Sequence, residues 1–93
     1  MERSSETIAG ELAARTLLPL VLSVCERRGV LLDEVCGRRR SQAVVAARQE
    51  VWYLLRNDPD RRFSFSELGR LFDRDHTTIR AGVLAHARSA TPR

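Results

Sequence analysis

The sequence predicts an all-α fold, a small helical bundle that contains a helix-turn-helix. β-Branched residues are few, and no run of four or more residues alternates in the way that a half-buried strand requires. Residues typical of helix ends separate the apolar stretches, notably Gly29 and the capping pair of Ser64 and Glu67. The last two stretches, 64–72 and 75–90, follow each other with the spacing of a helix-turn-helix. Any small helical bundle has adjacent helices, so the spacing alone leaves a purely structural role open.

The first third of the chain predicts three helices. An amphipathic stretch covers residues 5–17. A second helix is expected over 18–28, because Pro19 suits a first helical turn and Gly29 suits a helix end. Residues 31–36 are expected to form a short third helix. The apolar residues that we expect to face the core here are Ile8, Leu12, Ala13, Val21, Leu22 and Cys25.

A basic loop, Gly37-Arg38-Arg39-Arg40, precedes a long helix in the middle of the chain. Ser41 can cap this helix, which should run to about Arg56, where Asn57-Asp58-Pro59-Asp60 ends it. Its buried side is predicted to hold Val44, Val45, Val51, Trp52 and Leu55. We interpret the aromatic residues as core residues rather than stacking platforms for single-stranded nucleic acid: Trp52, Tyr53, Phe63, Phe65 and Phe72.

The final helix, expected over 75–90, is predicted to present its first turn to solvent. Asp75 can cap the helix by accepting a hydrogen bond from an unpaired amide two or three residues on. Apolar residues at helical spacing, Ile79 and Val83 first, would hold the rest of the helix on the core. A helix that presents its N-terminal residues in this way can read base edges in the major groove of DNA.

Length and composition exclude several classes of protein. A chain of 93 residues forms one small domain that buries about 60–65% of the surface its unfolded chain exposes, which leaves little room for a deep catalytic pocket. No apolar stretch approaches the roughly 20 residues that a membrane span needs. Glu2 and Glu6 near the N-terminus are unlike a secretory signal, so we expect a cytoplasmic, nucleoid-associated protein with no membrane contact.

Neither a metal site nor an enzyme is expected. Cys25 and Cys36 lie in apolar contexts without a Cys-x-x-Cys spacing, which favours buried free thiols. Only His76 and His86 could join them as ligands of a zinc ion. A Ser-His-Asp set could be assembled from the composition, but the sequence has no strand-turn-helix elbow and no glycine-rich phosphate loop. We therefore expect no cofactor.

Positive charge is concentrated in the second part of the chain. Residues 1–36 hold four Arg and six acidic residues, a net charge of −2, whereas residues 37–93 hold twelve Arg and six acidic residues, a net charge of +6. All sixteen basic residues are Arg, whose planar fork pairs with phosphate or guanine through two hydrogen bonds. A GC-rich genome would also favour Arg over Lys, but it does not explain the uneven distribution. The distribution favours an anionic partner for the second part.

The run Arg74-Asp75-His76-Thr77-Thr78-Ile79 resembles the signature of the C-terminal DNA-binding domain, domain IV, of the bacterial replication initiator DnaA. The basic loop, the stretch Ala47-Arg48-Gln49 and the helix start Ser66-Glu67-Leu68-Gly69 are similar to that family as well. The resemblance covers about residues 18–88. It implies a Trp-repressor-like all-α fold in a bacterial, stand-alone DnaA-like protein.

The resemblance also implies roles for individual residues. Asp75, His76 and Thr77 would face bases in the major groove, and Arg40 would enter the adjacent minor groove. Arg56 stands where the family often has a basic residue near the major groove. The residues expected to hold phosphates are Ser41, Arg48, Gln49, Arg74, Thr78 and Arg39. These assignments have plainer alternatives: Asp75 as a helix cap only, His76 as a solvated or core histidine, and the arginines as solvated or acid-paired side chains.

The chain departs from the family in three respects, of which the first is that the segment 58–63 is longer than usual. The turn before Arg74 is one residue shorter than usual and has Asp73 in place of a glycine, so an acid would face the DNA. No Gly-x-x-x-x-Gly-Lys-Ser/Thr sequence occurs, so the chain cannot melt an origin by itself as the initiator does.

We therefore expect a sequence-specific double-stranded DNA-binding protein that regulates transcription. The alternatives are a replication modulator that competes for initiator boxes and a protein-interaction module. In the last case the acidic N-terminal helix, with Glu6 and Glu11, would contact RNA polymerase or another regulatory protein. The expected organisation is an N-terminal extension over 1–17, a DNA-binding domain over 18–90 and a linker-like tail over 91–93.

Overall fold

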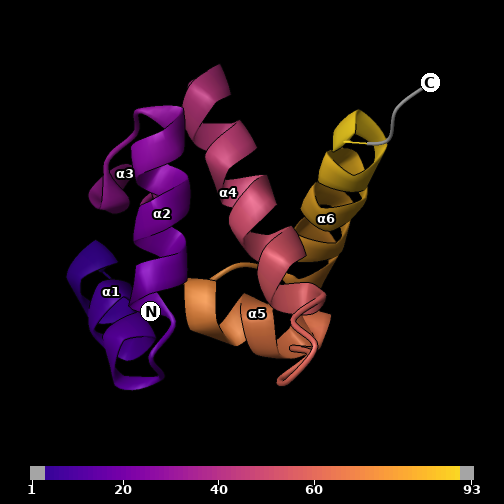
Figure 1. Cartoon of the computed structure of the whole chain (residues 1–93), viewed down its shortest axis with the longest axis horizontal. Coiled ribbons are helices and arrows are strands. Elements are labelled where there is room, and N and C mark those ends of the chain that lie inside the picture. Colours follow the sequence, from indigo (N-terminus) through magenta and orange to yellow (C-terminus); the bar gives the residue numbers. More distant parts are fainter. Residues whose placement is uncertain (1–3, 91–93) are drawn as a thin grey trace.

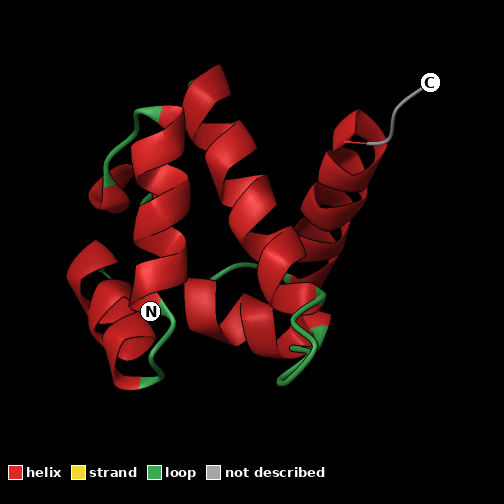
Figure 2. Cartoon of the chain, in the orientation of Figure 1, coloured by secondary structure: helices red, strands yellow, loops and turns green. Residues whose placement is uncertain are grey.

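Six helices and no strands make up the part of the chain that the computed structural model describes, residues 4–90 (Figure 2). They are α1 (Ser5–Ala14), α2 (Leu18–Arg28), α3 (Leu32–Cys36), α4 (Gln42–Arg56), α5 (Phe65–Phe72) and α6 (His76–Ala90). The predicted all-α fold is confirmed. The predicted tail, residues 91–93, lies outside the described residues. No helix in the described part is both long and apolar enough to cross a bilayer.

The long helix α4 is the centre of the arrangement. It lies between α2 on one side and α6 on the other, and α5 crosses below it (Figure 1). The helices α1 and α3 pack together beyond α2 (Figure 1). One continuous apolar core joins all six helices, and its members include Leu12, Val21, Val35, Val51, Leu68 and Ile79. The fold therefore places α6 on the side of α4 away from α2 (Figure 1).

The helix ends follow the signals in the sequence. The Ser41 side chain accepts from the backbone N of Val44 at 3.4 Å, and Gly29 ends α2 in the left-handed conformation at φ 68°. Ser64 and Glu67 form the predicted capping box, in which each side chain accepts from the other residue's backbone N–H at 3.1 and 2.9 Å. Because these signals are local, they fix the element boundaries without help from distant residues.

The N-terminal helix is shorter than expected but is part of the core. It ends at Ala14 because the chain turns at Thr16, whose φ is +58°, and sends Leu17 inward. Ile8 and Leu12 are fully buried, whereas Ala13 is exposed, contrary to the expectation. A step of about 100° per residue turns Ala13 away from the face that Leu12 occupies.

The same periodicity corrects two further expectations. Leu22 of α2 is 43% exposed, because Val21, Val24 and Cys25 already fill the side that faces the core. Val45 of α4 is only half-buried.

The aromatic residues lie in or against the core. Trp52, Phe63 and Phe72 are buried, and the rings of Trp52 and Phe72 meet edge to face with centroids 6.2 Å apart. Tyr53 and Phe65 are partly buried at its edge. Both cysteines are free and buried, as expected, and burial raises the pKa of the Cys36 thiol to about 11.

Candidate nucleic-acid interface

The turn between α5 and α6 sets the direction of the last helix. Asp73 adopts the left-handed conformation at φ 56° and ψ 53°, which Asp tolerates better than most residues. The turn also lies against Gly69, where an added Cβ would be 2.6 Å from the carbonyl oxygen of Arg74. Since the backbones approach so closely, only a glycine fits at position 69 without moving the turn. The turn therefore delivers α6 in a defined orientation.

The first turn of α6 faces solvent, as predicted. Asp75, His76, Thr77 and Thr78 are exposed, whereas Ile79 is fully buried. The Oδ1 atom of Asp75 accepts hydrogen bonds from the backbone N and the hydroxyl of Thr77 at 2.8 and 2.6 Å. The Thr77 hydroxyl, and then its backbone N–H, lower the pKa of the Asp75 carboxyl below its ordinary value. The side chain of His76 is 63% exposed and lies 3.6 Å from the same oxygen of Asp75.

The basic loop before α4 is held in place by two arginines from outside it. The Arg48 guanidinium donates to the carbonyl oxygens of Val35 and Glu34 in α3 and of Gly37 and Arg39 in the loop, at 2.9–3.2 Å. Arg74, from the α5–α6 turn, also donates to the carbonyl oxygen of Gly37. The path of the loop is thus tied both to α4 and to the helix-turn-helix.

The geometry of Arg48 differs from the expectation that this residue holds a phosphate. The residue is only 6% exposed, and its guanidinium is directed into the protein. Burial, followed by the nearby charge of Arg74, lowers the pKa of Arg48 from its ordinary value. Its four carbonyl acceptors compensate for the lost hydration, so Arg48 is a structural anchor of the loop.

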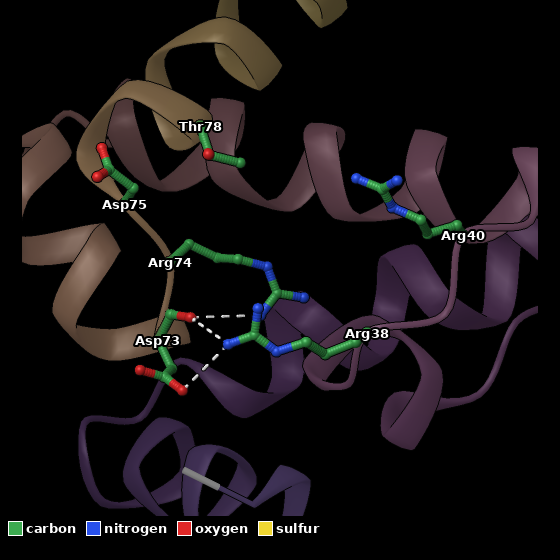
Figure 3. Close-up of a pocket in the computed structure, with 6 residues that line it drawn as sticks. All are labelled: Arg38, Arg40, Asp73, Arg74, Asp75 and Thr78. Carbon is green, nitrogen blue, oxygen red and sulfur yellow. Dashed lines mark hydrogen bonds and ion pairs between the residues drawn. The ribbon is translucent and has the colours of Figure 1, made fainter. Parts of the chain in front are cut away.

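The loop and the first turn of α6 open onto one cleft of about 650 Å³ (Figure 3). Figure 3 shows Arg38 and Arg74 reaching into this cleft from opposite sides. Arg40 lies at the loop end, and Asp75 and Thr78 lie at the helix end. The structure therefore brings together four of the residues that the sequence nominated. The cleft is lined by Arg38, Arg40, Asp73, Arg74, Asp75 and Thr78.

The remaining nominated residues lie around this cleft or away from it. Gln49 lies with Thr77 and Thr78 along a second groove of about 500 Å³ between α4 and α6. Ser41 is exposed next to Arg40, and Arg39 forms an ion pair with Glu34 at 3.5 Å.

Arg56 is at the opposite end of α4 from the basic loop. Its guanidinium lies 4.7 Å from the centre of the Phe65 ring, and it donates to the carbonyl oxygen of Phe63 at 3.5 Å. A helix of 15 residues is about 22 Å long, so Arg56 lines neither of the two grooves that hold the other residues.

Four residues at the site were not nominated as DNA contacts from the sequence: Arg38, Asp73, Ser66 and Arg70. Arg38 donates to both the carbonyl oxygen and the Oδ2 atom of Asp73 at 3.0 and 3.3 Å. Ser66 and Arg70 of α5 line a shallower groove next to His76. Arg70 could have been found, because it is a basic residue in the first helix of a helix-turn-helix. The partner of Arg38 is 35 positions away and leaves no local signal.

Comparison with known proteins identifies the family to which the helix-turn-helix belongs. The model of the family described as the bacterial DnaA protein helix-turn-helix matches residues 20–84. The chromosomal replication initiator protein DnaA of Mycoplasma pneumoniae is 33% identical over 64 residues, which are 69% of this chain and 14% of that protein. No solved structure matches. The chain spans only a small part of the length of this relative. The chain belongs to the bacterial DnaA helix-turn-helix family.

Proposed function

We propose that this chain binds double-stranded DNA at specific sequences and regulates transcription. The observation that carries the proposal is the shared cleft, onto which the exposed first turn of α6 and Arg40 both open. The major groove of DNA admits an α-helix, and a guanidinium group fits the narrow minor groove of A·T-rich sequence. A protein that reaches both grooves must straddle the sugar-phosphate strand between them. The cleft has arginines on both sides for that strand.

The first turn of α6 has chemistry suited to base edges. The cap bonds of Asp75 both go to Oδ1, so Oδ2 can accept from the amino group of a cytosine. The Thr77 hydroxyl donates to Asp75, which leaves its methyl group to pack against a thymine methyl. His76, exposed beside them, can make a similar apolar contact. Asp75 thus serves as a helix cap and a base contact at once.

Phosphate contacts would fix the register of the protein on the duplex. Thr78 and Arg74 line the cleft, Gln49 lies beside Thr78, and Ser41 and Arg39 flank Arg40. Such contacts position a protein without reading sequence. Arg48 is not among them, because its guanidinium is directed to backbone carbonyls. Arg56 would reach DNA only if the duplex extended along α5.

A replication modulator that occupies initiator boxes is the second candidate. The similarity to a protein named as a chromosomal replication initiator favours it. The two candidates share the interface and differ in where the protein acts. Occupancy mapped across a genome separates them, because a regulator concentrates at promoters and a modulator at the origin of replication.

A role of the N-terminal helix in binding RNA polymerase or another protein remains a third proposal. Deleting residues 1–17 does not test it, because Ile8 and Leu12 lie in the core and their loss would unfold the protein. Glu6 is exposed on α1, so Glu6→Gln changes the acidic face and leaves the core intact. Loss of activation in vivo with unchanged DNA binding would support this role.

The proposal is tested first by selecting bound duplexes from a random pool, which gives the site, its symmetry and the stoichiometry. The affinity for the selected site is then measured against salt concentration. If five to seven phosphates are neutralised, the slope of log K against log salt should be about −5. A flat salt response would refute the proposed interface.

Substitutions in the first turn of α6 test the base contacts. Asp75→Asn keeps a good helix cap but replaces an acceptor by an amide, and His76→Ala removes one side chain. Each should cost about 1–3 kcal/mol on the selected site and relax the preference at one position. Arg88→Ala is the matched control, because Arg88 is exposed on the same helix about 18 Å from His76. Equal losses for all three variants would exclude base reading by this turn.

A further inference from the structure

We propose that Asp73 determines the DNA affinity of this chain by holding Arg38 away from the DNA backbone. The Arg38–Asp73 pair acts as an internal substitute for a phosphate, which a bound strand has to displace. The inference rests on the proposed DNA-binding function and deepens it. It concerns a position where the chain has an acid in a turn that opens onto the cleft.

Arg38 and Asp73 form a close pair within the cleft. The Nη2 atom of Arg38 donates to the carbonyl oxygen of Asp73 at 3.0 Å and to its Oδ2 at 3.3 Å, and Figure 3 shows both side chains within the cleft. The fork of Arg38 therefore lies on the helix-turn-helix side of the cleft rather than extending from the loop. A phosphate offers the same acceptor chemistry as the Asp73 carboxylate.

The three loop arginines differ in their acidic partners. Arg38 is paired with Asp73, and Arg39 is paired with Glu34 at 3.5 Å. Arg40 is exposed and has no ion pair with any described residue. Asp73 and Glu34 thus engage two of the three consecutive arginines and leave Arg40 directed to the cleft.

The Arg38–Asp73 ion pair is exposed enough for a phosphate to compete with the carboxylate. The side chains of Arg38 and Asp73 are 53% and 29% exposed, and ion pairs with this much solvent access are weak. A phosphate brought into the cleft by the base contacts of α6 can replace the carboxylate. The displaced carboxylate would then remain beside an anionic strand. Both effects lower the affinity compared with a chain that lacks the acid.

The backbone does not require an aspartate at position 73. The φ of +56° belongs to the left-handed region, where glycine is unrestrained and Asn is tolerated as well as Asp. Asp73→Asn therefore removes the charge and retains the turn. This substitution separates the carboxylate from the conformation.

The test compares Asp73→Asn, Arg38→Ala and the double variant with the wild-type chain, on the selected duplex and on a random-sequence duplex. Asp73→Asn should bind both duplexes roughly threefold to tenfold more tightly, and the salt slope should steepen by up to about 0.9, because Arg38 gains one phosphate. Arg38→Ala should cost less affinity in the wild-type background, where Asp73 competes for the guanidinium, than in the Asp73→Asn background, where it should reverse the gain.

Glu26→Gln is the matched control for the loss of one negative charge, because Glu26 is exposed on α2 and lines neither the cleft nor the groove between α4 and α6. It should leave affinity and salt slope unchanged. The melting temperatures of all variants confirm that they fold.

The inference is overturned if Asp73→Asn binds DNA no more tightly than the wild type, or if Arg38→Ala costs the same in both backgrounds. An equal gain for Glu26→Gln also overturns it, since net charge alone would then explain the effect. A wild-type chain that binds no duplex overturns the proposed function, and this inference with it. A wild-type chain that binds while the pair makes no difference leaves the proposed function standing.

Discussion

Two groups of arginines differ in how deeply their acidic partners are buried. On the α2 side, Arg27 and Arg28 both donate to Glu50, with distances of 2.7 Å and 2.5 Å to its two carboxylate oxygens. The Glu50 side chain is only 10% exposed, so this cluster is part of the packed structure. In the basic loop, by contrast, all three arginines are exposed, and the acidic partners of Arg38 and Arg39 are themselves partly exposed. Neighbouring arginines in the sequence are thus fixed within the packed structure or left exposed at the surface, according to how deeply their acceptor is buried.

Arg48 shows the same rule from within α4. It stands two positions before Glu50, at the centre of the basic half of the chain, yet its fork is directed to four carbonyl oxygens. It therefore belongs with the structural arginines, although it supports the loop that presents Arg40. Substitutions in the Glu50 cluster should therefore affect stability alone, and substitutions of the loop arginines should affect DNA binding alone. Arg48 should affect both.

The largest effect is expected for Arg48→Met, which keeps an apolar side chain of similar length and removes the fork. Several carbonyl groups would lose their buried donors, so the free energy of unfolding should fall by about 3 kcal/mol. The loop should also lose its path, so binding to DNA should weaken even where the protein is folded. Urea denaturation and a gel-shift titration measure the two effects. Arg48→Lys should not restore either, because an ammonium group cannot donate in the same fork. A fully stable variant would show that the anchor is dispensable.

A smaller effect on stability alone is expected for Glu50→Gln. The amide is nearly the same size but cannot hold two guanidinium groups, and both arginines are partly exposed, so the cost should be about 1–2 kcal/mol. DNA affinity per folded molecule should be unchanged. A loss of affinity without a loss of stability would contradict the separation of the two groups.

The helix pattern and the outward face of α6 could be predicted because their signals are local. Ser41, Ser64 and Gly29 mark helix ends through bonds that span three or four residues. Asp75 followed by exposed polar residues and a buried Ile79 is also a pattern within one turn. The pairing of this turn with the basic loop came from the family resemblance, since nothing within either segment refers to the other.

The sequence-based expectations fail where contacts with distant residues determine the position of a side chain. Leu22 follows a residue that is also apolar, so periodicity alone did not show which of the two faces the core. The family resemblance implied that Arg48 holds a phosphate. Its buried role left no signal in the sequence, because its acceptors are backbone carbonyls, which are the same in any sequence. The Arg38–Asp73 pair joins residues 35 positions apart, and only the folded turn brings them together.

On the cleft side, Arg40→Ala should leave stability within about 0.5 kcal/mol of the wild type, because the side chain is exposed. Its effect should appear on DNA: a loss of roughly 1 kcal/mol on sites with an A·T-rich flank and a smaller loss on G·C-rich flanks, where the minor groove is wider. Titrations on duplexes that differ only in the flank measure this difference. Equal losses on all flanks would argue against insertion into the minor groove.

The smallest effect, and the one that sharpens the comparison most, is the acid dependence of stability. Burial raises the pKa of Glu50, but the hydrogen bonds from Arg27 and Arg28 outweigh it, so the pKa of the folded state lies below the ordinary value of about 4.3. Since the folded pKa is depressed, the carboxylate contributes stability above the unfolded pKa and loses it as the pH falls through the folded pKa.

The difference in unfolding free energy between the wild type and Glu50→Gln should therefore be constant near neutral pH and shrink below about pH 4. Urea denaturation at a series of pH values measures it. Asp73→Asn, whose carboxylate pairs at the exposed cleft, should show a much smaller stability difference at every pH, because that pair is weakened by solvent. If the two variants lost equal stability at every pH, burial of the acidic partner would not explain why one group of arginines is structural and the other stays exposed at the proposed DNA interface.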